Sequence, residues 1–288
     1  MQIVPRSPGV APLGGGAAAD RRWLRPVPTS ATALENTDAV ATLARPAGPV
    51  QRPRLERRRL DHTGIRVAPT VSVVIPALNE ERNLPSVLTA LPQDVSEVLV
   101  VDGLSTDRTI EVAKETIPDV RIVRQKGRGK GNALQSGFEA AEGDIVVMLD
   151  ADGSMIPSEI PAYVAELQKG AEFVKGSRFL PAGGSDDLTP VRKLGNFGLR
   201  TTFNLLYGAK HTDLCYGFAA FWRRCLPNLN FHHDGFEVET VLCIRAAQAK
   251  LRVHEVPSYE RSRQYGQSNL HAVRDGMRIL RVLLSGAN

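Results

Sequence analysis

The sequence predicts an α/β fold with a mostly parallel sheet flanked by helices. From residue 71 onward, short apolar runs of strand length alternate with segments that carry helical periodicity. Strands that alternate with helices in this way form a parallel sheet, which the helices cover on both faces. Polar residues follow several of the apolar runs, and ligands bind at the carboxyl ends of the strands in such sheets. We therefore expect one α/β domain with a ligand site along that edge.

The chain divides into two regions of different composition. Residues 1–69 are rich in Pro, Ala, Gly and Arg and have no apolar periodicity, which predicts a disordered basic tail. Residues 1–70 hold 11 Arg, no Lys and 5 acidic residues, whereas the whole chain has a net charge of +5. The predicted domain at 70–288 is therefore close to neutral. A near-neutral domain excludes a nucleic-acid-binding core, which needs a cationic face.

Membrane and compartment signals are sparse in this sequence. No run reaches the roughly 18 apolar residues that a membrane-spanning helix needs, and the start lacks the pattern of a signal peptide. Cys215, Cys225 and Cys243 have no metal-ligand spacing, so reduced thiols in a cytoplasmic protein are the simplest interpretation. The arginine-rich segment 52–59 is suited to anionic lipid head groups, which leaves a peripheral position at the inner face of the cell membrane open.

The first half of the domain is predicted to alternate strands and helices regularly. The strands are expected at 71–76, 98–102, 120–124, 144–149 and 172–174. Asn79 is expected to cap the first helix, and Ser105 or Thr106 the second, which runs to about Glu115. Two more helices are expected at 132–141 and 158–168.

The second half follows a less regular pattern. Helices are expected at 194–207 and 236–249, and strands at 217–222 and 252–256. A last amphipathic helix is expected at 270–284. Its apolar stripe consists of Val273, Met277, Leu280 and Leu284. We expect this stripe to pack on the core, with membrane contact as the alternative.

Two carboxylates follow the fourth predicted strand, in Asp150-Ala-Asp152. In an extended segment, residues two apart point to the same side, so these carboxylates converge. Two hard oxygen ligands, completed by water and substrate phosphates, suit Mg²⁺ or Mn²⁺, and such an ion neutralises a diphosphate leaving group. The alternative is a simple Asp-Ala-Asp-Gly turn. An EF-hand calcium loop is excluded, because Met155 and Pro161 stand where that loop requires Gly and Glu.

Polar residues at the ends of the first two strands indicate a nucleotide site. Asp102 closes the second strand, where a carboxylate can accept hydrogen bonds from a ribose or a base. Pro76, Leu78 and Glu80 at the end of the first strand can complete a nucleoside pocket. The alternatives are a turn role for Asp102 and pairing with the helix dipole for Glu80. The basic segment 126–131 lacks P-loop spacing and is interpreted as a flexible loop that shields phosphates.

An ordered set of motifs gives the chain a family resemblance over residues 70 to 284. The motifs of the first half are Pro76–Glu80, Val101–Asp107, Lys126–Gly129, Asp150–Gly153 and Gly176–Arg178. In this order and spacing they resemble family 2 glycosyltransferases of the GT-A fold, with a Rossmann-like sheet. The later motifs resemble the branch of dolichol-phosphate mannose synthases and other polyprenyl-phosphate glycosyltransferases. They are Asp213–Phe218, Gly235–Glu239, Val256–Tyr259 and Arg263–Ser268.

The resemblance implies an inverting, metal-dependent hexosyltransferase that uses a GDP- or UDP-sugar. It implies that the nucleotide-sugar donor is held by Pro76, Leu78, Glu80, Val100, Asp102 and Ala151. Mg²⁺ or Mn²⁺ would be held by Asp150 and Asp152, and by Ser154, which stands where the branch usually has Gln. Arg178 and Arg263 would grip phosphates, because a guanidinium binds phosphate oxygens bidentately. The implied catalytic residues are Asp150, Asp152, Arg178 and Arg263.

The resemblance also implies a polyprenyl phosphate acceptor at the membrane surface, and Arg192 beside the apolar segment 194–207 is a candidate contact. Such a phosphate is already an anion, so its attack needs no strong base. A hydroxyl acceptor is the alternative, and it would need a carboxylate to take its proton. Asp213, Glu237 and Glu239 are the candidates for that base, and the sequence does not choose among them.

Two further alternatives are a nucleotidyltransferase and a non-catalytic nucleotide-sugar-binding protein. A nucleotidyltransferase typically carries a glycine-rich basic loop where this chain has Pro76–Glu80. A binding protein is favoured by Asn269, because the branch usually has Lys there. Release of a nucleoside diphosphate, rather than of pyrophosphate or of nothing, separates these alternatives. The sequence does not indicate an oligomeric state.

Overall fold

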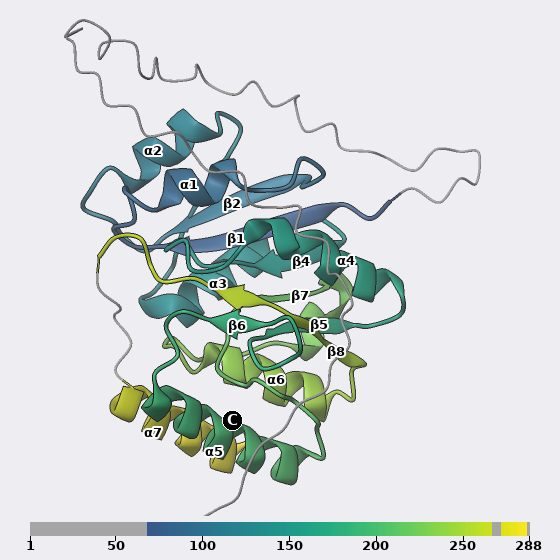
Figure 1. The fold of residues 1–288 in the computed structure, drawn as a ribbon. Coiled ribbons are helices and arrows are strands. Elements are labelled where there is room, and N and C mark those ends of the chain that lie inside the picture. Colours follow the sequence, from purple (N-terminus) through teal and green to yellow (C-terminus); the bar gives the residue numbers. More distant parts are fainter. Residues whose placement is uncertain (1–67, 267–271, 287–288) are drawn as a thin grey trace, which may run out of the picture. The chain divides into compact units, whose positions relative to one another are not determined.

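The computed structural model describes residues 68–266 and 272–286 (Figure 1). The predicted tail falls almost entirely outside these ranges, and so do Asn269 and the end of the Arg263–Ser268 motif. In the described part of the chain, no helix is both long enough and apolar enough to cross a membrane.

The described domain is built on a seven-stranded, mostly parallel sheet, which confirms the predicted fold class. The strand order is β3-β2-β1-β4-β7-β5-β8. The strands are β1 (Val71–Ala77), β2 (Glu97–Asp102), β3 (Arg121–Arg124), β4 (Ile145–Met148), β5 (Phe173–Ser177), β7 (Ala219–Trp222) and β8 (Val253–Pro257). Only β7 runs antiparallel to its neighbours β4 and β5. A separate two-stranded sheet pairs β6 (Gly184–Ser185) with β9 (Tyr259–Glu260).

The helices cover both faces of the large sheet (Figure 1). They are α1 (Leu84–Thr89), α2 (Thr109–Thr116), α3 (Gly129–Ala140), α4 (Ile160–Gln168), α5 (Pro190–Tyr207), α6 (Val238–Gln248) and α7 (Ala272–Ser285). Two 3-10 turns, η1 (Pro157–Glu159) and η2 (Arg223–Asn228), complete the described elements. Most of the predicted elements are confirmed within a few residues of their expected bounds.

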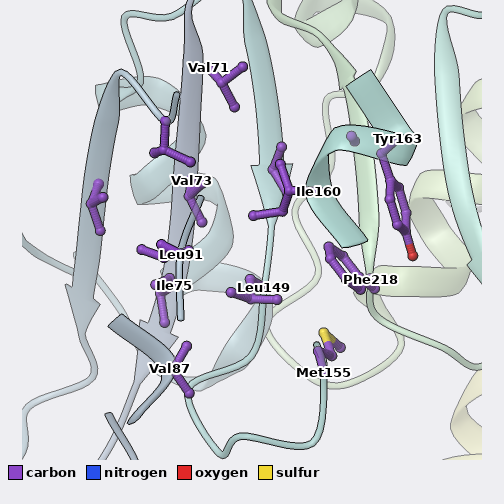
Figure 2. Close-up of a cluster of buried hydrophobic side chains, with 14 of the residues drawn as sticks. Val71, Val73, Ile75, Val87, Leu91, Leu149, Met155, Ile160, Tyr163 and Phe218 are labelled. Carbon is purple, nitrogen blue, oxygen red and sulfur yellow. The ribbon is translucent and has the colours of Figure 1, made fainter. Parts of the chain in front are cut away.

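Two hydrophobic clusters lie on opposite faces of the sheet, because successive side chains of a strand point to opposite sides. Val73 and Ile75 of β1 face the cluster shown in Figure 2, which includes Ile160 of α4. Val74, between them in sequence, faces the second cluster, where Leu134 of α3 and other residues of α3 and α6 pack. Because both faces are covered, the polar groups of the strand ends gather at the edges of the sheet.

Parallel pairing brings the carboxyl ends of the strands to one edge. Ala77 at the end of β1 pairs with Asp102 at the end of β2, and Val74 pairs with Met148 at the end of β4. The Asp150–Ser154 loop therefore begins beside the last residues of β1.

The predicted capping role of Asn79 is wrong. Helix α1 begins at Leu84, after a turn, and its N-cap position is Asn83. Asn79 instead adopts a left-handed backbone with φ 56°, and its side chain accepts a hydrogen bond from the backbone N of Thr106 at 2.8 Å. Asparagine tolerates this backbone region because its short amide makes local hydrogen bonds. The residue thus ties the β1 and β2 loops together.

The predicted apolar stripe of the last helix is also wrong at two positions. Met277 and Leu284 are 62% and 69% exposed, whereas Ile279, Val282 and Leu283 are buried. The buried residues follow the i, i+3 and i+4 spacing of one helix face, and that face packs on α5 and α6. The helix carries apolar residues on two sides, and the periodicity alone did not identify the side that meets the core.

Candidate active site

A cavity of about 1230 Å³ lies at the carboxyl edge of the sheet. One end is lined by the segments that follow β1, β2 and β4, including Leu78, Gly103 and Asp152. The other end is lined by α5 and α7, including Val191 and Ile279. A cavity of this size accommodates a nucleotide sugar together with part of a second substrate.

Lys130 bridges two carboxylates in the cavity wall. It lies in the first turn of α3, and its Nζ is 2.6 Å from Oδ1 of Asp150 and 2.7 Å from Oε1 of Glu239. Burial raises the pKa of Asp150 to about 6; Asp152 and Glu239 act in the same direction, and Lys130 opposes them. Burial alone would lower the pKa of Lys130, but the two carboxylates outweigh it and raise that pKa. The lysine stays protonated beside Asp150.

Arg263 contacts the second carboxylate of the Asp-Ala-Asp motif. Its Nη2 lies 2.6 Å from Oε1 of Glu80, and its Nε lies 3.4 Å from Oδ2 of Asp152. The other Glu80 oxygen accepts a hydrogen bond from Nδ2 of Asn83 at 2.6 Å. Burial raises the pKa of Glu80, although Asn83 and Arg263 both oppose that rise. The loop after β1 and the loop after β4 are thus joined through one guanidinium.

The chemistry of these groups fits a divalent cation. Glu80, Asp150, Asp152 and Glu239 are four carboxylates paired with two cations, Lys130 and Arg263, so the group carries excess negative charge. Among residues 68–266 and 272–286, no three His, Cys, Asp or Glu side chains form a preassembled metal cluster. The oxygen donors of Asp150, Asp152 and Ser154 match the ligand type that Mg²⁺ prefers, and such an ion would need its other ligands from phosphates and water.

Arg178, at the end of β5, is held by two acids. Its Nε and Nη2 donate to the two carboxylate oxygens of Asp213 at 2.7 and 2.9 Å, and its Nη1 donates to Glu260 at 3.0 Å. Burial would raise the pKa of Asp213, but the hydrogen bonds and charge of Arg178 lower it overall. A buried carboxylate with a lowered pKa is a poor proton acceptor. The structure therefore favours a role for Asp213 in orienting Arg178. It does not favour Asp213 as the base.

Most of the predicted site residues meet in this cavity. Those that line it are Pro76, Leu78, Glu80, Asp150, Ala151, Asp152, Ser154, Arg178, Arg192, Glu239 and Arg263. They come from loops that are far apart in sequence, and the parallel sheet brings them to one edge. Of the three candidate bases, Glu239 alone is among the lining residues.

The structure does not bring the other predicted residues to the cavity wall. Val100 is fully buried among the core residues of the sheet. Asp102 is buried, and its Oδ1 accepts a hydrogen bond from the backbone N of Ser105 at 3.0 Å, which is the turn role weighed as the alternative. Glu237 is buried and lies 3.8 Å from Nη1 of Arg278. Asp213 is buried behind Arg178.

Sequence reasoning missed Lys130, although it lies in the basic segment 126–131. The two glycines that flank Lys130 were the sequence signal that could have identified it. A Cβ on Gly129 would lie 2.1 Å from the carbonyl O of Asp234, and one on Gly131 would lie 1.9 Å from the carbonyl O of His233. The start of α3 therefore packs directly on the 233–234 backbone, and Lys130 is fixed between these contacts. Residues 126–128 form a loop as predicted, whereas residues 129–131 form the first turn of α3.

Glu260 and Asp275 were also missed, because neither carries a motif of its own. Glu260 belongs to the short strand β9 and reaches Arg178. Asp275 lies on α7, is buried, and lines the cavity. Both positions depend on tertiary packing of the second half of the chain.

The fold and site define an α/β protein with a carboxylate loop at a nucleotide-sized cavity, and comparison with known proteins identifies its family. The family model described as glycosyl transferase family 2 matches residues 72–229. The chain belongs to this family, as its motifs implied, and its enzyme class is that of the glycosyltransferases.

Similar proteins include a dolichol-phosphate mannosyltransferase and a glucosyl-3-phosphoglycerate synthase. The chain is 29% identical to Glycosyltransferase AglJ of Haloferax volcanii, over 72% of this chain and 68% of that protein. It is 30% identical to a dolichol-phosphate mannosyltransferase of Pyrococcus furiosus, over 69% of this chain and 59% of that protein. A solved structure of glucosyl-3-phosphoglycerate synthase from Mycobacterium tuberculosis, bound to Mn²⁺, UDP-glucose and phosphoglyceric acid, is 28% identical. Its TM-score is 0.62, with coverage of 76% of this chain and 80% of that one.

Proposed function

We propose that this chain transfers a hexose from a GDP- or UDP-sugar to a polyprenyl phosphate, with inversion and with Mg²⁺ or Mn²⁺. The observation that carries the proposal is the difference between the two ends of the cavity. Asp150 and Asp152 lie at the end formed by the strand termini, and apolar residues of α5 and α7 line the other end. A charged donor and an apolar acceptor suit these two ends respectively.

The strand end of the cavity suits the nucleotide sugar. The exposed Leu78 and Leu104 line the loops after β1 and β2, where they offer apolar contact to a base. Asp150, Asp152 and Ser154 would hold the ion, and when bound it neutralises the charge that builds on the diphosphate. Arg263, whose Nε lies 3.4 Å from Asp152, would contact phosphate oxygens from that side.

The helix end of the cavity suits a lipid phosphate. Val191, Leu199 and Ile279 line it with apolar surface, and Arg192 and Arg274 add cations, with the buried Asp275 3.5 Å from Arg274. A guanidinium can bind the acceptor phosphate, while the apolar residues contact the first isoprene units. Because the phosphate is already an anion, the chain has no need to remove a proton from it. The residues then act by positioning two phosphates and screening their charge.

A hydroxyl acceptor is a second candidate, because Glu239 lines the cavity and can approach a substrate proton. Its Oε1 lies 2.7 Å from Nζ of Lys130, so a substrate proton would have to approach an oxygen that already contacts the lysine. The similar structure from Mycobacterium tuberculosis contains phosphoglyceric acid, so a phosphate-bearing hydroxyl acceptor belongs in the same test. Under this candidate, Glu239→Gln abolishes turnover; under the lipid-phosphate proposal, it leaves substantial turnover.

The test is an acceptor and donor panel with product detection. The chain is incubated with GDP-mannose, UDP-glucose or UDP-galactose, with Mn²⁺, and with a short polyprenyl phosphate or 3-phosphoglycerate. Nucleoside diphosphate release and glycosylated product are followed by mass spectrometry, and NMR of the product reports the anomeric configuration. We expect a glycosyl polyprenyl phosphate whose anomeric configuration is inverted relative to the donor. Pyrophosphate release would indicate nucleotidyl transfer, and no release from any donor would indicate a binding protein.

A further inference from the structure

Helices α5 and α7 lie side by side and share an outer face. The hydroxyl of Tyr207 at the end of α5 donates a hydrogen bond to the carbonyl O of Leu283 on α7 at 3.0 Å. The first turns of both helices also line the same cavity, through Val191 and Arg274. The two helices are therefore parallel neighbours, and Figure 1 shows them together on one side of the domain.

The outer side of α5 presents an unusually apolar surface. Its exposed large apolar residues are Val191, Leu194, Phe197, Leu205 and Leu206. Leu194 is 73% exposed and Leu205 is 84% exposed, and Val191 precedes Leu194 by one helical turn. A helix of a globular protein normally turns such a stripe toward the core. A run of exposed apolar residues along one helix marks a contact surface, whereas single exposed residues need no explanation.

Helix α7 adds more apolar residues and a row of cations. Met277 and Leu284 are exposed, and Arg274, Arg278 and Arg281 are exposed on the same helix. The only acid in α7, Asp275, is buried and lies 3.5 Å from Arg274 and 3.6 Å from Arg278. The 18 residues of α5 contain no acid at all, and Lys193 is exposed beside Leu194. The shared surface of α5 and α7 is thus apolar and cationic.

We propose that this α5/α7 face docks on an anionic lipid bilayer. Amphipathic helices that combine Leu or Phe with Lys or Arg lie in the membrane interface, with the apolar side chains in the acyl region and the cations at the head groups. The positive charge of this face favours an anionic partner, such as the head groups of a bilayer. A second copy of the chain in a self-complementary contact would place the same cations against each other. Residues 1–67, with 11 Arg and 5 acids, carry the same sign of charge as the face.

Docking in this orientation would bring the cavity to its lipid substrate. Val191, Gly195 and Leu199 of α5 line the apolar end of the cavity, and Leu194 and Leu205 of the same helix point outward. A bilayer on the outer face would thus lie one helix away from the acceptor end. This step rests on the proposed function, because it assumes that the acceptor comes from the bilayer. Binding of the face to anionic lipid can be measured without any acceptor.

The test is flotation of the full chain with vesicles of phosphatidylglycerol and phosphatidylcholine, against phosphatidylcholine alone. We expect binding to the anionic vesicles only. Leu194→Glu with Leu205→Glu should weaken it at least tenfold, since both side chains would leave the acyl region. Lys193→Gln with Arg281→Gln should weaken it about 25-fold, at about fivefold for each cation. Arg223→Glu, on η2 at the opposite end of β7 from the cavity, is the matched charge control and should bind like the unchanged protein.

The outcomes separate the docking surface from the proposed reaction. Unchanged vesicle binding in both double variants would overturn the proposal. If changing the arginines of 52–59 then abolished vesicle binding, the membrane contact would be assigned to the tail. A dimer in solution that Leu194→Glu dissociates, with no vesicle binding, would assign the face to a second copy. If vesicle binding is absent while a short polyprenyl phosphate in detergent is still glycosylated, the result supports the proposed reaction and contradicts the proposed docking surface. Variants that keep the native thermal unfolding midpoint and turn over that short acceptor exclude misfolding as the cause.

Discussion

The two ends of the cavity are built from different structural elements, and the contrast explains how the site divides its work. The strand end holds charged groups: Asp150 and Glu239 are largely buried, and both contact Lys130. The helix end is made by α5 and α7, whose outer sides expose Leu194 and Met277. Charged catalytic groups need placement on ordered strands and helices, whereas an isoprenoid acceptor needs apolar surface. We propose that the strand end serves the reaction and that the helix end serves access of the acceptor.

Changing Asp152 to Asn gives the largest effect that we predict. The amide would lose the charge that holds the ion, and we expect turnover to fall about a thousandfold. The fold should persist, because Asp152 lies on a loop outside the core, so the thermal unfolding midpoint should move little. Asp94→Asn, on an exposed loop between α1 and β2, is the control and should keep full turnover. Full activity of Asp152→Asn, or of the unchanged chain in excess chelator, would contradict the metal assignment.

Changing Asp213 to Asn tests the support behind the charged end. Removing one partner of a buried ion pair costs about 3–5 kcal/mol of unfolding free energy, because the other charge stays buried. Arg178 would keep only Glu260 as a charged partner among the contacts seen here. Chemical denaturation should show the loss in stability, and turnover should fall as well through misplacement of Arg178. A variant with native stability and no turnover would instead indicate that Asp213 acts as the base.

Metal affinity should depend on pH at the strand end. The pKa of Asp150 is raised by burial to about 6, from an ordinary value near 4. Below pH 6 the carboxyl is protonated and neutral, so a metal ion must displace a proton to bind. We expect Mn²⁺ affinity to fall toward tenfold for each pH unit below 6, and to level off above it. Calorimetric titration of the chain with Mn²⁺ checks this, and constant affinity between pH 5 and 7 would contradict it.

Changing Val191 to Gln should separate the two ends by their substrates. Val191 lines the helix end and is exposed, so the variant should fold normally. We expect the KM for a short polyprenyl phosphate in detergent to rise about threefold, from the loss of one apolar contact, and the KM for the nucleotide sugar to stay constant. An increase in the KM for the nucleotide sugar instead would mean that the two ends are assigned the wrong way round.

Removing residues 1–67 should have the smallest effect. The tail has no motif in the family resemblance and no apolar periodicity, so we propose that it is dispensable for chemistry. Turnover on a short acceptor in detergent should remain within about twofold of the full chain. The truncated chain should also keep its unfolding midpoint. Loss of folding on truncation would contradict the proposed division of the chain at residue 70.

The sequence predicted the strand half of the molecule better than the helix half, for physical reasons. Runs such as 71–76 and 145–149 are apolar because both faces of a parallel sheet are covered, so their pattern directly predicts buried strands. The convergence of Pro76, Asp150 and Arg178 then followed from topology. Helix α7 has apolar residues on two sides, and only packing against α5 and α6 decides that Ile279 faces inward and Met277 outward.

The pairing of charges was beyond the reach of sequence patterns. Lys130 meets Glu239, 109 residues further along the chain, and Arg263 meets Glu80 across 183 residues. No local spacing encodes such contacts. They also changed the interpretation of Asp213, which is a plausible base by residue type and an ion-pair partner by position. The motifs predicted which residues gather at the edge, and the structure showed which of them hold the others in place.

The most direct test of the account is a competition between acceptors in one reaction. The full chain is given UDP-glucose and GDP-mannose with Mn²⁺, and equal amounts of a short polyprenyl phosphate and 3-phosphoglycerate, with Asp152→Asn as the inactive control. Mass spectrometry then measures both glycosylated products. We predict a glycosyl polyprenyl phosphate as the main product, formed by the unchanged chain and lost in excess chelator. Glycosylated phosphoglycerate alone would contradict the division of the cavity into a charged donor end and an apolar acceptor end.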